Sequence, residues 1–249
     1  MLPEIGPEEF SAALDRVASE VLGHSGVRRP PVDAVSIARA LEITLAWDDR
    51  QRGRGRYVRL RGRHGGRSRA TILARPESRP ERRQWAVAHE IGEHVAYRVF
   101  AALGVDPREA PPNAREHVAN HLAGRLLLPA GWFAADARAW GWDLLRLKGR
   151  YRTASHELIA RRMLEMPPPV VISIFDNGAL TFRRSNLAGR VPPPSPAELA
   201  CRRAVHDHSQ PQQTRAGPQV IQAWPVHEEG WKREILRVEL DVEFDQVAI

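Results

Sequence analysis

The stretch best suited to chemistry is "AVAHEIGEHVAYRVF", residues 86–100. It contains His89 followed by Glu90, the pair with which a zinc-binding helix of the pattern H-E-x-x-H begins. In that pattern two histidines four residues apart bind Zn²⁺ from one side of the helix, and the glutamate polarises the attacking water. Here the fourth position after His89 holds Glu93, and the next histidine, His94, comes one residue later.

Two residues are therefore alternative second ligands beside His89. In a regular α-helix Glu93 lies about 40° around the axis from His89, and His94 lies about 140° away. A one-residue insertion taken up as a π-bulge near Gly92 would bring His94 back. The peptidase family of dipeptidyl-peptidase III is similar, because it has H-E-x-x-x-H with zinc on both histidines. We expect His94 as the ligand, because zinc prefers a second nitrogen, and keep Glu93 as the alternative.

A solvent-facing charged helix is the competing interpretation of the same residues. Apolar residues stand on both sides of the His89-Glu90 pair, so this part of the helix should be buried. A buried charged cluster is costly unless it is paired or bound to a metal. A third ligand should then come from a neighbouring helix, and the segment 114–129 offers Glu116, His117 and His121.

Three motifs in the same order resemble the ImmA/IrrE family of zinc metallopeptidases. The resemblance implies a zincin-like domain with Zn²⁺ as cofactor, His89 and Glu116 as ligands and Glu90 as catalytic base. The sequence departs from the family at the second ligand, where Glu93 replaces the family's histidine. The motifs are "PVDAVSIARALEI", "RRQWAVAHEIGEH" and "EHVANHLAGRLLLP".

What the resemblance implies is a zinc-dependent endopeptidase that cuts a regulatory protein, such as a helix-turn-helix transcriptional repressor. The alternative is a catalytically impaired member of the family that acts as a regulator by binding DNA or a repressor. Loss of the second histidine from its usual place motivates the alternative.

The helices and strands that the sequence predicts around these residues indicate an α+β protein. A zincin-like domain with an active-site helix, a second ligand helix and a small sheet should precede a helix-turn-helix-like segment and a small β-rich part. We expect the corresponding boundaries at 1–137, 138–166 and 167–249. The expected helices and strands are helices at 8–22, after Asp33, at 80–102 and 113–128, a strand at 43–47, a hairpin at 55–74 turning at His64-Gly65-Gly66, a hairpin at 170–186 turning at Asp176-Asn177-Gly178, and a last strand at 234–244.

The segment 188–219 is rich in Pro, Gln, Ser and His, and we interpret most of it as a flexible linker. His206 and His208 then have no function, and Cys201 has no histidine partner that would make it a nucleophile. A single cysteine excludes an intramolecular disulfide and favours a reducing compartment.

The chain carries a net charge of +7. This excess suits an acidic partner such as nucleic acid, and the helix-turn-helix-like segment offers Arg150, Arg152, Arg161 and Arg162 for phosphate contacts. No signal peptide and no apolar run of about 20 residues is visible, so we expect a soluble cytoplasmic protein without membrane contact.

Overall fold

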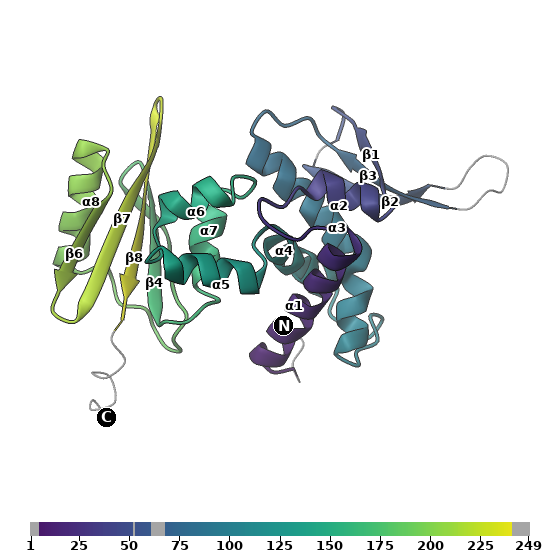
Figure 1. The fold of residues 1–249 in the computed structure, drawn as a ribbon, viewed down its shortest axis with the longest axis horizontal. Coiled ribbons are helices and arrows are strands. Elements are labelled where there is room, and N and C mark those ends of the chain that lie inside the picture. The colour runs from purple at the N-terminus through teal and green to yellow at the C-terminus, as the bar shows by residue number, and fades with distance from the viewer. Residues whose placement is uncertain (1–4, 52, 61–67, 241–249) are drawn as a thin grey trace. The chain divides into compact units, whose positions relative to one another are not determined.

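The computed structural model describes residues 5–51, 53–60 and 68–240, and within them the chain is mixed α and β (Figure 1). It divides into two compact units. The first contains the residues up to Gly141 together with Gly149–Ser155, and the second contains Trp142–Lys148 together with the residues from His156 onward. The predicted α+β class is confirmed.

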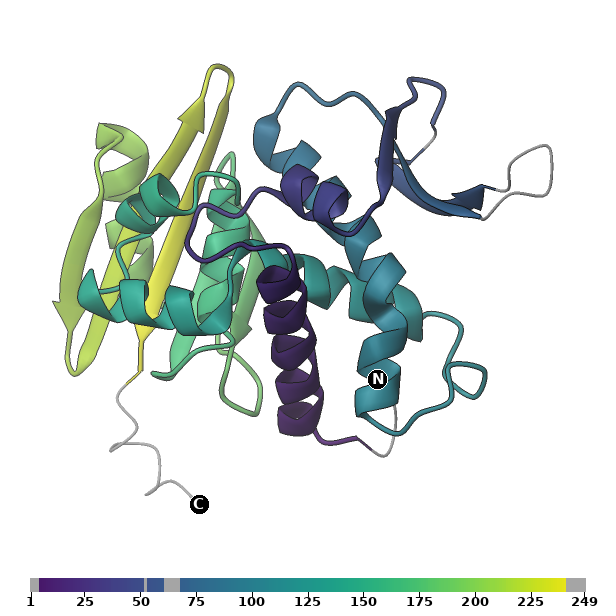
Figure 2. The ribbon, with the colours of Figure 1, turned by 45° about the vertical axis from the view of Figure 1, so that its right-hand side comes forward.

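Four helices of the first unit, α1 to α4, lie where the sequence predicted helices, whereas α5 was not predicted. A proline at the start of both α1 and α3 fits the first helical turn, where its missing N–H has no partner to lose. Asp33 caps α2 by accepting a hydrogen bond from the N–H of Val35 at 3.2 Å. Contacts join α1 to α3 and α4, and Figure 2 shows α1 and α3 side by side. The helices are α1 (Pro7–His24), α2 (Ala34–Ala40), α3 (Pro80–Ala102), α4 (Ala114–Leu127) and α5 (Ala130–Ala139).

A three-stranded sheet completes the described part of this unit. Its order is β1-β3-β2, with β1 parallel and β2 antiparallel to β3. The outer strand β2 contacts α3, which places one edge of the sheet beside the helix that carries the predicted catalytic residues. The expected turn of the β2–β3 hairpin at His64-Gly65-Gly66 lies outside the described residues. The strands are β1 (Thr44–Trp47), β2 (Gly55–Leu60) and β3 (Arg69–Ala74).

An antiparallel sheet of order β5-β4-β8-β7-β6 forms the centre of the second unit. The predicted hairpin is present, and Asn177 and Gly178 make its two-residue turn with positive φ angles of 47° and 84°. The strands are β4 (Val170–Asp176), β5 (Ala179–Ser185), β6 (Gln212–Ala216), β7 (Gln219–Glu228) and β8 (Trp231–Glu239).

Helices cover both faces of this sheet, and the side chains of β8 alternate between them. Leu236 and Val238 join the apolar core beneath α8 (Pro196–His208), and Glu234 meets the same helix. Arg233, which points the other way, donates to a carboxylate of α7 (His156–Met163). Burial on both faces explains why strand β4, with the sequence VVISIFD, is almost continuously apolar.

The prediction of a flexible linker over 188–219 is wrong. Helix α8 and strand β6 occupy most of that segment, and β7 follows directly. Ser195 and Glu198 form a reciprocal capping box at the start of α8. Cys201 and Val205, one turn apart, anchor the helix on the sheet. The polar composition belongs to the solvent face of an ordered helix.

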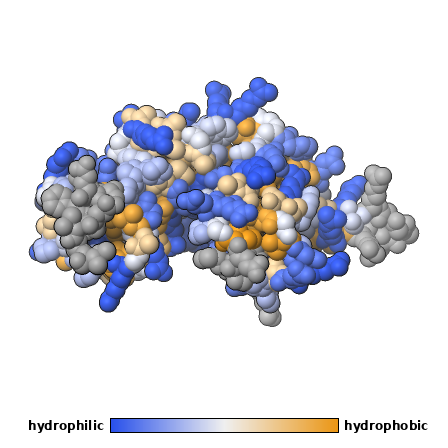
Figure 3. Space-filling model, turned by 90° about the horizontal axis from the view of Figure 1, so that it is seen from below, coloured by the Kyte–Doolittle hydropathy of each residue, from blue (hydrophilic) through white to orange (hydrophobic). Residues whose placement is uncertain are grey.

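The segment 138–166 does not form a unit of its own. Helix α6 (Leu144–Arg150) runs from the second unit into residues assigned to the first, and α7 belongs to the second. In the described chain no helix is both long and apolar enough to span a bilayer. The face in Figure 3 is mainly hydrophilic, with smaller apolar patches between the polar side chains.

Candidate metal centre

The predicted catalytic base, Glu90 of helix α3, is buried. Glu90 is only 6% exposed and accepts a backbone hydrogen bond from Tyr57 on β2. Gly55 makes room for it, because a Cβ atom there would lie 2.8 Å from Glu90 Oε1. Burial raises the pKa of Glu90, and this effect outweighs the opposing influence of His89 and the Tyr57 hydrogen bond. The carboxyl group is therefore held close to a β-strand in a site that favours its protonated form.

Three donor side chains lie beside Glu90 on α3 and α4. Ligand atoms of His89, Glu93 and Glu116 all lie within 4.8 Å of one another. His89 Nε2 is 3.5 Å from Glu116 Oε2, which is longer than a good hydrogen bond. Asn120 holds the other Glu116 oxygen with a hydrogen bond of 3.1 Å. The structure thus brings together two of the expected ligands and the alternative second ligand.

His94 is not part of this donor cluster. Helix α3 is a continuous α-helix from Pro80 to Ala102, so the expected bulge near Gly92 does not occur. The His94 ring contacts Tyr57, with its Nδ1 atom 2.9 Å from the phenolic oxygen. Burial is the largest cause that lowers the pKa of His94, followed by nearby arginines, so the site favours the neutral imidazole. The geometry favours Glu93 over His94 as the second ligand.

Arg115, which the sequence analysis did not identify, holds the Glu93 side chain in place. Its Nε atom lies 2.6 Å from Glu93 Oε2, and its Nη2 atom donates to the Glu93 carbonyl oxygen at 2.9 Å. Tyr57 is the other residue that sequence reasoning missed. Both missed residues are remote in sequence from the His-Glu pair, and no motif marks them.

A cavity of about 580 Å³ opens over the donor cluster. Its walls come from the start of β2, from α3 and from α4. The lining residues include Arg54, Tyr57, Trp85, Glu90 and Arg115. A cavity of this size accommodates several residues of a peptide or a small molecule, and the three donors and the buried carboxyl group all line it.

The four arginines predicted for phosphate contacts are divided between the two units. Arg150 and Arg152 belong to the first unit, and Arg150 is 3.5 Å from Asp136. Arg161 and Arg162 belong to the second unit. Arg161 pairs with a glutamate one turn earlier and lies over an aromatic ring of β5. Arg162 is 3% exposed and pairs with a glutamate three residues later, so its guanidinium is not available to a phosphate.

Comparisons with known proteins support the fold and leave the family open. No protein-family profile and no curated protein sequence matches the chain. One solved structure that is similar is described as a Mycobacterium tuberculosis transcriptional regulator. The match has a TM-score of 0.63 at 18% sequence identity and covers 97% of this chain and 86% of that chain. The chain therefore shares its fold with that regulator, and the ImmA/IrrE resemblance stays a prediction.

Proposed function

We propose that the protein is a zinc-dependent endopeptidase that acts in transcriptional regulation, with a regulatory protein such as a helix-turn-helix repressor as substrate. The observation that supports this proposal most strongly is the cluster of His89, Glu93 and Glu116, which lines one cavity together with the buried Glu90. The regulatory role is supported by the fold shared with a transcriptional regulator.

The donor set fits zinc. Two ligand atoms at about 2.0–2.1 Å from one tetrahedral ion are about 3.4 Å apart, and His89 Nε2 is 3.5 Å from Glu116 Oε2. Glu93 supplies a second carboxylate, and its salt bridge to Arg115 leaves one oxygen for coordination. When bound, zinc polarises a peptide carbonyl group and makes water more acidic.

Glu90 is suited to move the proton in this reaction. General bases work best when their pKa is close to the working pH, and burial shifts the pKa of Glu90 upward from that of a free glutamate. Glu90 would take a proton from the attacking water and deliver it to the nitrogen of the departing amine. Gly55 and the backbone of Tyr57 keep the carboxyl group in place during both transfers.

A non-enzymatic regulator is the second candidate. Two carboxylates and one imidazole form a harder donor set than the two histidines and one carboxylate of many zinc peptidases. Such a site would bind zinc more weakly, and the protein would then act by binding DNA or a repressor. The shared fold with a transcriptional regulator favours this candidate as much as the first.

Zinc content and cleavage of a peptide library separate the two candidates. The wild type loaded with zinc should cleave library peptides, with products identified by mass spectrometry. Glu90→Gln should keep its zinc and lose cleavage by roughly 100-fold or more. Glu20→Gln on the exposed face of α1 is the matched control and should cleave normally. A zinc-loaded wild type that cleaves neither the library nor a helix-turn-helix repressor would favour the second candidate.

A further inference from the structure

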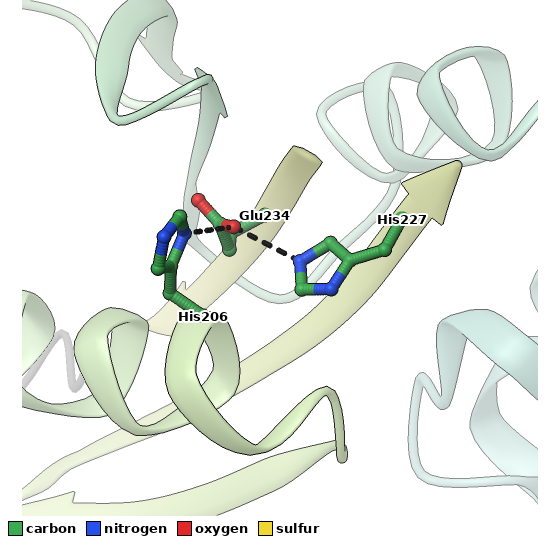
Figure 4. Close-up of side chains that lie close together, drawn as sticks. All are labelled: His206, His227 and Glu234. Carbon is green, nitrogen blue, oxygen red and sulfur yellow. Dashed lines mark hydrogen bonds and ion pairs between the residues drawn. The ribbon is translucent and has the colours of Figure 1, made fainter. Parts of the chain in front are cut away.

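A second group of metal-type side chains lies in the second unit, where α8 packs on the sheet. His206 comes from the last turn of α8, His227 from the end of β7 and Glu234 from the start of β8. Figure 4 shows both imidazoles pointing at the same carboxylate oxygen, with Glu234 Oε1 2.8 Å from His206 Nδ1 and 3.0 Å from His227 Nε2. Three elements thus converge on one point.

Glu234 is a fully buried carboxylate with an unsatisfied oxygen. Its side chain is 0% exposed, and Oε2 accepts no hydrogen bond from any residue that the structure describes. The nearest cationic atom to Oε2 is Arg202 Nη1, at 3.6 Å. A buried carboxylate costs several kcal/mol unless its oxygens are bonded or coordinated. The carboxylate therefore has coordination capacity that the protein side chains do not use.

Ser209 sets the orientation of His227. The Ser209 hydroxyl oxygen lies 2.9 Å from His227 Nδ1, on the side of the ring away from Glu234. If Nδ1–H donates to this oxygen, Nε2 keeps its lone pair and faces the carboxylate. A ligating histidine in proteins usually has such a partner on its other nitrogen. Ser209 is itself held by the left-handed conformation that ends α8, at φ 53°.

We propose that His206, His227 and Glu234 form a binding site for a divalent transition-metal ion, with zinc as the favoured ion. Their ligand atoms lie within 4.8 Å of one another, so movements of about an ångström or less bring all three to zinc distances. Two imidazole nitrogens select zinc, nickel or cobalt over magnesium and calcium, which prefer oxygen ligands. His206 is 34% exposed, which leaves the fourth position open to water.

Two cations near the cluster set the strength of binding. Arg202 lies beside the carboxylate, and Lys232 Nζ donates to the carbonyl oxygen of His206 at 3.0 Å. Their charges oppose a metal cation, so the site should bind zinc more weakly than a closed structural site and exchange it reversibly. Since the three ligands come from α8 and from both strands of the β7–β8 hairpin, the ion would fasten the end of α8 to that hairpin. This proposal is independent of the peptidase function.

Zinc titration of the full chain tests the site, in a variant that lacks the other donor cluster. The background His89→Ala/Glu116→Ala removes two donors of the cluster on α3 and α4. We expect this protein, stripped of metal by a chelator, to bind one zinc ion and to gain thermal stability with zinc. Adding His227→Ala should lower the zinc affinity at least 100-fold and abolish the stabilisation. Ser209→Ala should lower the affinity by roughly 10-fold to 100-fold.

Two further variants keep the test decisive. His208→Ala removes a histidine from the same last turn of α8 that is not part of the cluster, and it should bind zinc like the background. If His227→Ala does not fold, His206→Ala replaces it, because His206 is more exposed. The proposal is overturned if the background binds no zinc, or if removing either cluster histidine leaves the affinity unchanged.

Discussion

A Cβ atom on Gly92 of α3 would lie 2.7 Å from the carbonyl oxygen of Ala119 on α4 and 2.9 Å from its Cα atom. The two helices therefore touch backbone to backbone at this point. His89 precedes Gly92 by three residues, and Glu116 precedes Ala119 by three residues. The close contact fixes the separation at which the two helices present these donors.

Gly92→Ala should destabilise the protein although alanine is the better helix former. Replacing glycine in a helix gains about 1 kcal/mol, whereas forcing atoms into a closed contact typically costs 1–3 kcal/mol, and here the neighbour is backbone that cannot rotate away. We expect a net loss of about 1 kcal/mol in the free energy of unfolding, measured by urea denaturation, together with weaker zinc binding. Gly23→Ala in α1, where a Cβ meets nothing within 4 Å, is the control and should not destabilise.

Gly55→Ala should impair activity more than stability. The added methyl group would meet the Glu90 carboxylate at 2.8–3.2 Å, and that side chain can move. Displacing the base from its place beside Tyr57 should reduce kcat by roughly 10-fold to 100-fold while the free energy of unfolding changes little. The measurement is cleavage of a library peptide at saturating concentration. Gly53→Ala, in the loop before β2, has no contact closer than 3.6 Å and should leave kcat unchanged.

Sequence reasoning identified the helices of the site because their apolar periodicity is strong. It misread Gly92, since a glycine needed for backbone freedom and a glycine needed for close helix contact look the same in a sequence. The expected π-bulge depended on the first interpretation of Gly92, and the prediction of His94 as a metal ligand depended on the bulge. Only the packing of α3 on Ala119 distinguishes the two roles.

The prediction of a flexible linker over 188–219 failed for a different reason. Helix α8 has few fully buried apolar residues, Cys201 and Val205, and they are too few to give a clear apolar periodicity. Strand β7 contains Pro225, which normally argues against an inner strand. The pairing with β6 ends at Ala223, so at Pro225 the strand β7 is paired with β8 alone, and a proline is tolerated at such an edge position. The cluster around Glu234 was missed because its three residues meet only when α8 and β7 are in place.

The second ligand of the zinc site that we propose on α3 and α4 can be assigned by comparing two variants. With the regular helix seen in α3, Glu93→Ala should lower zinc affinity by at least 10-fold, and His94→Ala should change it little. The reason is that Glu93 shares the cluster with His89, whereas His94 is bonded to Tyr57. Competition with a chromogenic chelator measures both affinities. A larger loss in His94→Ala would mean that zinc induces the bulge that the sequence suggested.

Helix α8 should depend on its capping box. Ser195→Ala removes the side-chain oxygen that accepts from the N–H of Glu198 at 3.2 Å, which should cost about 1 kcal/mol. Opening of α8 would expose Arg202 and Arg203 to trypsin. We expect the wild type to resist early cutting at these two residues and Ser195→Ala to be cut faster, as read by mass spectrometry. Early cutting of the wild type inside α8 would contradict the ordered helix.

Asp33 should contribute stability that depends on pH. Burial pushes its pKa upward, but hydrogen bonds from Ser36, Gln84 and the N–H of Val35 outweigh this and hold the pKa below 3.8. The folded state then binds fewer protons than the unfolded state as the pH falls through 3.8, so the contribution is complete above that pH and is lost below it.

Asp33→Ala should therefore cost about 1 kcal/mol at neutral pH, and the difference from the wild type should shrink as the pH falls through 3.8 toward the lower folded pKa. Urea denaturation across the acidic range measures it. Asp33→Asn is the matched control, because its amide oxygen can still accept the hydrogen bond from Val35 but does not titrate. The stability advantage of the wild type over Asp33→Asn should also fall with pH. An advantage that stays constant through this range would show that the charge of Asp33 contributes nothing.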